Sequence, residues 1–177
     1  MMSRQLLLLR HAKSSWDEPD LSDHERPLAK RGRKAGALLR EFFRAEAIRP
    51  DLVLVSSAKR ALETLDALNP WASPPPVEIL PALYHAAPET ILETIRAAPG
   101  SARILLVIAH NPGLHDFALR LSGASNAAPA RRMAEAYPTG ALAQFELDRP
   151  WAELELNGGK LTRFVTPKEL SAMERAP

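Results

Sequence analysis

Two histidines of this sequence stand directly after strongly apolar segments. Arg10 and His11 follow the four leucines at positions 6–9, and His110 follows the apolar run of residues 103–109. Such short runs predict strands that are buried on both faces, as in a parallel sheet. Ligands bind beyond the carboxyl ends of such strands, so we expect these side chains to share one site. Arg60 lies in the first turn of a predicted helix, where a cation hints at a nearby anion.

Arg10, His11, Arg60 and His110 together suit phosphoryl transfer. A phosphoryl group in transfer carries its charge on three equatorial oxygens, so catalysis is mainly positioning and electrostatic stabilisation. Guanidinium groups match phosphate geometry with two parallel hydrogen bonds. A neutral His11 could attack phosphorus in line and form a phosphohistidine that water then hydrolyses. For this, a hydrogen bond must hold one ring nitrogen while the other faces the phosphate.

The segments expected to position these residues alternate between strands and helices. We predict strands at residues 5–10, 51–55, 77–80, 103–109 and 140–147, and helices at residues 28–46, 58–68, 88–97 and 114–121. Ser56 and Ser57 are expected to cap the N-terminus of the helix at 58–68. This alternation predicts an α/β fold, a three-layer α/β/α sandwich with a mostly parallel mixed sheet.

The remaining segments are expected to be less regular. The polar residues 12–28 predict a loop at the rim of the site, and residues 122–138 show no clear pattern. Residues 151–156 and 160–165 alternate between apolar and polar types around Asn157-Gly158-Gly159, which predicts a hairpin. Residues 171–177 are expected to be a frayed tail. Because no domain boundary is visible, we expect residues 1–177 to form one domain.

Composition excludes several classes of function. The 177 residues carry a net charge of +2 and no cysteine, which excludes disulfides, thiolate nucleophiles and cysteine-ligated zinc. No dense stripe of Lys and Arg is present, so no nucleic-acid partner is expected. No apolar run approaches the length of a membrane span, so we expect a cytoplasmic protein without a membrane partner. The histidines lack metal-ligand spacing, so neither a metal nor another cofactor is expected.

Several segments resemble motifs of a known family, in the family's order. They are Arg10-His11-Ala12-Lys13-Ser14, Arg26-Pro27-Leu28 with Gly32, Ser56-Ser57-Ala58-Lys59-Arg60-Ala61-Leu62-Glu63-Thr64, Leu83-Tyr84, Ala109-His110-Asn111-Pro112-Gly113 and Pro138-Thr139-Gly140-Ala141. Together they resemble the phosphoglycerate mutase-like histidine phosphatase superfamily, and within it the SixA-type phosphohistidine phosphatase group. The resemblance runs from about residue 6 to residue 167.

The resemblance implies a catalytic core of Arg10, His11, Arg60 and His110, in which His11 becomes phosphorylated without a metal. Four further residues are candidates for lining the phosphate pocket, namely Lys13, Ser14, Asn111 and His85.

One departure from the family bears on the substrate. The exit of the third predicted strand, residues 80–82, carries no carboxylate where mutases and monoesterases place a proton donor. An alkoxide leaving group needs that proton, whereas the imidazole of phosphohistidine can leave already protonated. The sequence therefore favours phosphohistidine over a sugar phosphate. Glu89 or His85 could still supply a proton from a neighbouring loop.

We therefore expect a metal-independent phosphatase that forms phospho-His11 and acts on phosphohistidine in a partner protein, with inorganic phosphate as the product. One alternative is a phosphatase of small phosphorylated substrates. Another is a catalytically weak module that binds phosphate or a phosphoprotein. The sequence does not decide the oligomeric state, although a monomer is favoured.

Overall fold

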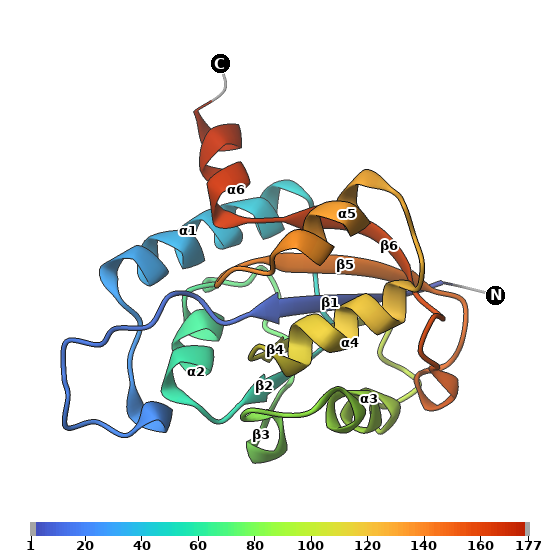
Figure 1. The fold of residues 1–177 in the computed structure, drawn as a ribbon, viewed down its shortest axis with the longest axis horizontal. Helices are drawn as coiled ribbons and strands as arrows, with labels where there is room; N and C mark the ends of the chain where they lie inside the picture. The colour runs from blue at the N-terminus through green and yellow to red at the C-terminus, as the bar shows by residue number, and fades with distance from the viewer. Residues whose placement is uncertain (1–2, 176–177) are drawn as a thin grey trace.

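The computed structural model describes residues 3–175, which contain a six-stranded sheet in the order β3-β2-β4-β1-β5-β6 (Figure 1). The strands are β1 (Arg4–Arg10), β2 (Leu52–Ser56), β3 (Val77–Leu80), β4 (Ile104–Ala109), β5 (Leu142–Leu147) and β6 (Lys160–Val165). The first four are parallel, β5 is antiparallel to β1, and β6 is antiparallel to β5. The predicted α/β fold with a mostly parallel mixed sheet is confirmed.

Helices cover both faces of the sheet. They are α1 (Lys30–Ala45), α2 (Lys59–Asp66), α3 (Pro88–Arg96), α4 (Gly113–Ser122), α5 (Ala128–Glu135) and α6 (Pro167–Glu174). Successive side chains of a strand point to opposite faces. Leu6 and Leu8 therefore pack with residues of α3, α4 and α5, while Leu7 and Leu9 pack with residues of α1, α2 and α6. This double cover explains why β1 needs four leucines in succession (Figure 1).

The register of the sheet brings the two histidine segments together. β1 and β4 are parallel neighbours, with Arg10 opposite Ala109, so His11 and His110 leave the sheet at the same edge. Val55 of β2 lies opposite Ile108 of β4, which places the start of α2 at that edge as well. The arrangement of parallel strands is therefore sufficient to gather residues that are far apart in the sequence.

Two of the predicted irregular segments are helical. Residues 128–135 form α5 because Ala130 and Met133 face the core, which the mixed composition of this stretch concealed. Residues 167–174 form α6, so the predicted tail is wrong up to residue 174, and positions 176 and 177 lie outside the described residues. Thr166 accepts a hydrogen bond from the Glu169 backbone N–H and caps this helix, while Leu170 is buried.

The predicted hairpin between residues 151 and 165 is also wrong. Trp151–Glu153 forms a 3-10 turn, and the Trp151 indole donates a hydrogen bond of 2.8 Å to the Ala102 carbonyl. The second arm, residues 160–165, is a strand, but it pairs with β5. β5 is a strand of six residues, whereas residues 151–153 form only a three-residue turn. Residues 160–165 therefore pair with β5. Across residues 3–175, every helix falls short of the length or the apolar character that crossing a membrane needs.

Candidate active site

The His11 ring is held in one orientation at the end of β1. Its Nδ1 lies 2.8 Å from the Ala12 carbonyl, and the Nε–H of Arg60 points at its Nε2 from 3.4 Å. A carbonyl can only accept, so Nδ1 carries the proton and donates it. The lone pair is therefore on Nε2, the nitrogen that faces Arg60. The His11 residue is only 6% exposed.

His110 lies beside His11, with 4.9 Å between the ring centroids. Its Nε2 is 2.7 Å from the Ser56 hydroxyl oxygen, and its buried Nδ1 has no hydrogen-bond partner within residues 3–175. Arg10 donates from Nη1 to the Tyr137 carbonyl at 2.9 Å, while its buried Nε is also unpaired in that range. The unpaired Nε–H of Arg10 is a donor for an incoming ligand with acceptor oxygens. Nδ1 of His110 is a second donor in the tautomer in which the Ser56 hydroxyl donates to Nε2.

Burial and nearby arginines keep both imidazoles neutral at pH 7. Burial is the main cause that lowers the pKa of His11 to about 4, and the charges of Arg60 and Arg10 add to it, although the hydrogen bond to Ala12 acts in the opposite direction. Burial also lowers the pKa of His110, to about 2, with His11 and Arg60 as further causes. The unprotonated Nε2 of a neutral ring can act as a nucleophile once the Nε–H of Arg60, which donates to it here, turns to a phosphoryl oxygen.

Arg60 is fixed by the first turns of α2. The residue is 2% exposed, and its backbone carbonyl accepts a 2.6 Å hydrogen bond from the Thr64 hydroxyl. The same hydroxyl oxygen accepts from the Ala12 N–H at 2.9 Å. Thr64 therefore links the helix that carries Arg60 to the backbone that follows His11, which gives a physical reason for the spacing of Arg60 and Thr64 in the sequence.

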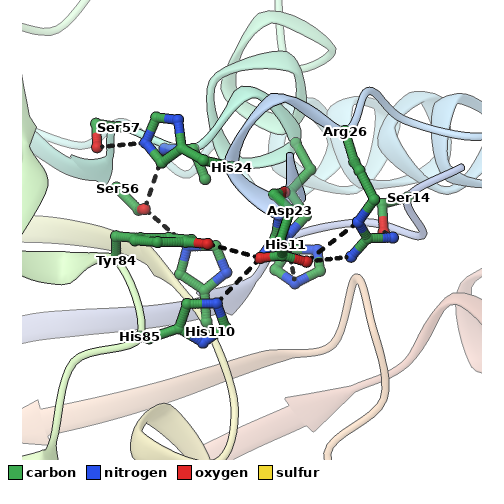
Figure 2. A network of polar contacts seen from close by, with 12 residues as sticks. His11, Ser14, Asp23, His24, Arg26, Ser56, Ser57, Tyr84, His85 and His110 are labelled. Atoms are coloured by element: carbon green, nitrogen blue, oxygen red, sulfur yellow. Dashed lines mark hydrogen bonds and ion pairs between the residues drawn. The ribbon is translucent and has the colours of Figure 1, made fainter. Parts of the chain in front are cut away.

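A carboxylate that the sequence did not single out lies at the centre of the polar network (Figure 2). Asp23 Oδ1 accepts two hydrogen bonds from Arg26, at 2.9 and 3.1 Å. Its Oδ2 accepts from Arg60 at 3.0 Å and from the Tyr84 hydroxyl at 2.7 Å, and lies 3.1 Å from His85 Nε2. Asp23 thus connects its own loop, the start of α2 and the segment after β3, and it holds Arg60, whose side chain contacts His11.

Asp23 remains ionised throughout the usual pH range. Partial burial acts to raise the pKa of this carboxyl, but the hydrogen bonds from Tyr84, His85, Arg26 and Arg60 outweigh it and hold the pKa far below its usual value. Asp23 therefore provides a permanent negative charge and is not a source of protons at neutral pH.

The four additional candidates have different outcomes. His85 belongs to the network: its ring stacks on that of His110 at 5.5 Å, and its φ of +50° is rare for a residue with a side chain. The Ser14 hydroxyl accepts from Arg26 at 2.9 Å, and Asn111 donates to the Tyr137 carbonyl at 3.0 Å. Lys13 is exposed, and its backbone carbonyl accepts a hydrogen bond from the backbone N–H of Ala29.

Ser56 and Ser57 do not cap α2, contrary to the prediction. The N-cap residue is Ala58, which has no side-chain hydrogen bond. The Ser56 hydroxyl contacts His110, and the Ser57 hydroxyl lies 2.9 Å from His24 Nε2. Both hydroxyls thus contact histidine rings, and the Ser56 oxygen also accepts a 3.3 Å hydrogen bond from the backbone N–H of Ala58.

Sequence reasoning missed Asp23, Arg26, Tyr84 and Ser56 as site residues. The signal for three of them was present, because Arg26, Tyr84 and Ser56 lie in motif segments that were noted, although Ser56 was expected to cap a helix and none of the three was assigned to the site. Asp23 gave no signal, since it is one of several acidic residues in the loop. Glu89, considered as a proton donor, is paired with Arg120 at 2.6 Å on the surface. Within residues 3–175, no three His, Cys, Asp or Glu side chains are arranged to hold a metal ion.

Comparisons with known proteins agree with this fold. An uncharacterized protein of Mycobacterium tuberculosis is 36% identical over 163 residues, which cover 90% of this chain and 100% of that protein. The structure of the protein histidine phosphatase SixA complexed with tungstate matches with a TM-score of 0.73 and 25% identity, over 94% of this chain and 99% of the other.

A protein of Nakamurella multipartitia, provisionally named a phosphohistidine phosphatase SixA, matches with a TM-score of 0.83 and 24% identity, over 94% of this chain and 98% of that one. Residues 6–87 match the sequence profile of the histidine phosphatase superfamily (branch 1). His11 and Arg60, which lie side by side in the structure, are both within the matched range, and the chain belongs to the histidine phosphatase superfamily.

Proposed function

We propose that this protein is a metal-independent phosphatase that transfers the phosphoryl group of its substrate to His11, and that its substrate is phosphohistidine in a partner protein. The observation that carries the proposal is the state of the His11 ring. Nδ1 is tied to the Ala12 carbonyl, so the lone pair on Nε2 faces the guanidinium of Arg60. A nucleophile and a phosphate-binding cation are thereby placed side by side.

In the first step, the Nε2 lone pair of His11 attacks phosphorus while the bond between phosphorus and the substrate nitrogen breaks. The electron pair of that bond stays on the leaving imidazole, which departs neutral when its other nitrogen already carries a proton. Arg60 and Arg10 neutralise charge on the transferring oxygens. The neutral His110 ring lies close enough to contact the same group, with 4.9 Å between it and the His11 ring.

In the second step, water attacks phospho-His11. A bond forms between the water oxygen and phosphorus, and the electron pair of the phosphorus–nitrogen bond returns to Nε2. Both protons of the water remain on the product, dihydrogen phosphate, before exchange with solvent. His11 regains the neutral form that it has in the free protein, where its pKa is lowered to about 4.

The surroundings of the third strand support phosphohistidine as the substrate. Pro81–Leu83, directly after β3, form a 3-10 turn without a carboxylate, and the Glu89 carboxylate is paired with Arg120. Asp23 is ionised and has no proton to give. Phosphohistidine needs a proton donor less than a phosphomonoester does, because its leaving group is an imidazole rather than an alkoxide. The likeness of the fold to SixA structures supports the same class of substrate.

The test compares wild-type protein with His11→Gln on a phosphohistidine protein and on p-nitrophenyl phosphate, with EDTA present throughout. We expect His11→Gln to lower the phosphatase activity at least about 1,000-fold, as loss of a nucleophile does. His115→Gln is the matched control, because His115 on α4 contacts the Met133 carbonyl of α5. We also expect the wild type, but not His11→Gln, to form an acid-labile phosphoenzyme.

Four results would contradict the proposal. Activity that survives His11→Gln, or that EDTA removes, would contradict the mechanism. A phosphomonoester turned over much faster than phosphohistidine would indicate a phosphatase of small substrates. Tight binding of a phosphoprotein with no release of phosphate would indicate a binding module.

A further inference from the structure

The mouth of the site is formed by three side chains that contact one another. Oδ2 of Asp23 accepts from the Tyr84 hydroxyl and lies 3.1 Å from His85 Nε2 (Figure 2). The side chains of Asp23 and His85 are 41% and 52% exposed, whereas His11 and His110 are buried. Because Asp23 and His85 are exposed while His11 is buried, we take the Asp23 side of this network as the path by which a substrate reaches the nucleophile.

The leaving group of a substrate must lie along this path. In an in-line transfer the leaving group is on the side of phosphorus opposite the attacking nitrogen, and here that nitrogen is at the buried end. One guanidinium links the two positions, because Arg60 Nε faces His11 while Arg60 Nη2 donates to Asp23 at 3.0 Å. A phosphoryl group held by Arg60 in front of His11 therefore brings its leaving group next to Asp23.

The Asp23 carboxylate is saturated before substrate binds. Five contacts converge on its two oxygens, three of them on Oδ2. An ionised carboxylate offers about four acceptor positions. When phosphoryl oxygens take over the Nη2 group of Arg60, Oδ2 keeps the contacts with the Tyr84 hydroxyl and His85 Nε2. A leaving imidazole that displaces the exposed His85 ring then finds an acceptor position on Oδ2.

We infer that Asp23 determines the specificity of the site, because it accepts a hydrogen bond from the N–H of a leaving imidazole and opposes leaving groups that carry negative charge. The inference rests on the proposed function and adds the residue that selects the substrate class. An imidazole phosphorylated on one nitrogen and protonated on the other offers this N–H. An alkoxide or phenolate offers none and develops charge of the same sign as Asp23.

The proton balance of this step needs no general acid. The bond between phosphorus and the imidazole nitrogen breaks with its electron pair, and the proton on the remote nitrogen stays there. Asp23 stabilises that protonated nitrogen as a hydrogen-bond acceptor and remains ionised. This explains how a site can act on phosphohistidine although residues 80–82 after β3 carry no carboxylate.

The experiment measures kcat/KM for N-phosphoimidazole and for p-nitrophenyl phosphate in the wild type, Asp23→Asn and Asp23→Glu. In Asp23→Asn we expect the preference for N-phosphoimidazole to fall about tenfold, the size of one hydrogen bond to a charged group. Activity on p-nitrophenyl phosphate is expected to rise, because the opposing charge is gone. Asp23→Glu keeps the negative charge and is expected to retain part of the preference for N-phosphoimidazole. If thermal melts show that Asp23→Asn is unstable, the comparison of Asp23→Glu with the wild type still tests the inference.

Asp20→Asn is the matched control, since Asp20 is exposed in the same loop and the change removes the same charge. We expect it to leave both activities unchanged. An equal fall on both substrates in Asp23→Asn would show that Asp23 only holds the arginines, and an unchanged preference would show no role in selection; either result overturns the inference. Failure of the proposed function is seen separately, as activity without His11 or as a wild type that does not turn over N-phosphoimidazole.

Discussion

The Ser56 hydroxyl oxygen lies 2.7 Å from Nε2 of His110, and both side chains are buried. This contact occupies one ring nitrogen of His110 and leaves Nδ1 without a partner in the described part of the chain. A serine at the end of β2 therefore fixes the orientation of a histidine at the end of β4.

Replacing Ser56 with alanine should weaken both stability and activity. We expect the free energy of unfolding to fall by about 1–3 kcal/mol, because a buried ring nitrogen loses its partner. We expect kcat to fall about tenfold because the ring is no longer oriented. Denaturant unfolding and steady-state kinetics measure the two effects. Ser57→Ala is the control, since Ser57 contacts His24 instead; equal effects in the two variants would show that the Ser56 contact has no special role.

Thr64→Val should show the importance of the link between α2 and the residue after His11. The isosteric change removes the acceptor of the Ala12 N–H and the donor to the Arg60 carbonyl. We expect a loss of about 1–3 kcal/mol and a lower kcat, because a buried N–H is left unpaired beside the nucleophile. Thr94→Val is the matched control, because Thr94 makes the same kind of hydrogen bond to the carbonyl of Thr90 within α3. It should cost under about 1 kcal/mol and leave kcat unchanged.

Gly32→Ala should disturb the loop that follows His11. A Cβ at Gly32 would overlap the carbonyl oxygen of Lys13, so α1 and this backbone segment could not keep their present distance. Overpacking of this kind costs about 1–3 kcal/mol, which a thermal or denaturant melt would detect. Gly100→Ala is the control, because its Cβ would meet nothing within 4 Å. If both variants melted like the wild type, a Cβ at position 32 would fit beside the Lys13 carbonyl without cost, contrary to this prediction.

The free energy of unfolding should decrease as the pH falls below about 6.5. The pKa of His11 is lowered from 6.5 to about 4 in the folded protein, and that of His110 is lowered further, mainly by burial. Below pH 6.5 the unfolded chain therefore binds more protons than the folded one, so acid favours unfolding. Each histidine adds a slope of up to about 1.4 kcal/mol per pH unit.

Denaturant unfolding at pH 7 and pH 5 measures this slope. The double variant His11→Gln/His110→Gln should lose clearly less stability between these values than the wild type. Asp23 also has a lowered pKa, but its contribution is lost only below its ordinary value of 3.8, outside this window. A slope that is the same in the wild type and the double variant would contradict the assignment.

The sequence by itself determined the sheet and the position of the principal residues. A buried parallel strand needs apolar side chains on both faces, so residues 6–9 and 104–109 predict their structure locally. The carboxyl ends of parallel strands meet at one edge, which is why His11 and His110 could be expected to lie together before the structure was known. Arg60 was marked both by its place in the first turn of a predicted helix and by the family motifs.

Tertiary structure decided what surrounds these residues. Asp23, Tyr84 and Arg60 come from three segments of the chain, and their contact depends on how those segments fold over the sheet edge. Ser56 contacts a histidine instead of capping a helix because β2 and β4 are neighbours in the sheet. A loop carboxylate has no periodic pattern that would mark it, and its local partner Arg26 does not place it at the site. Its position beside Arg60 follows from the long-range contacts with Arg60, Tyr84 and His85.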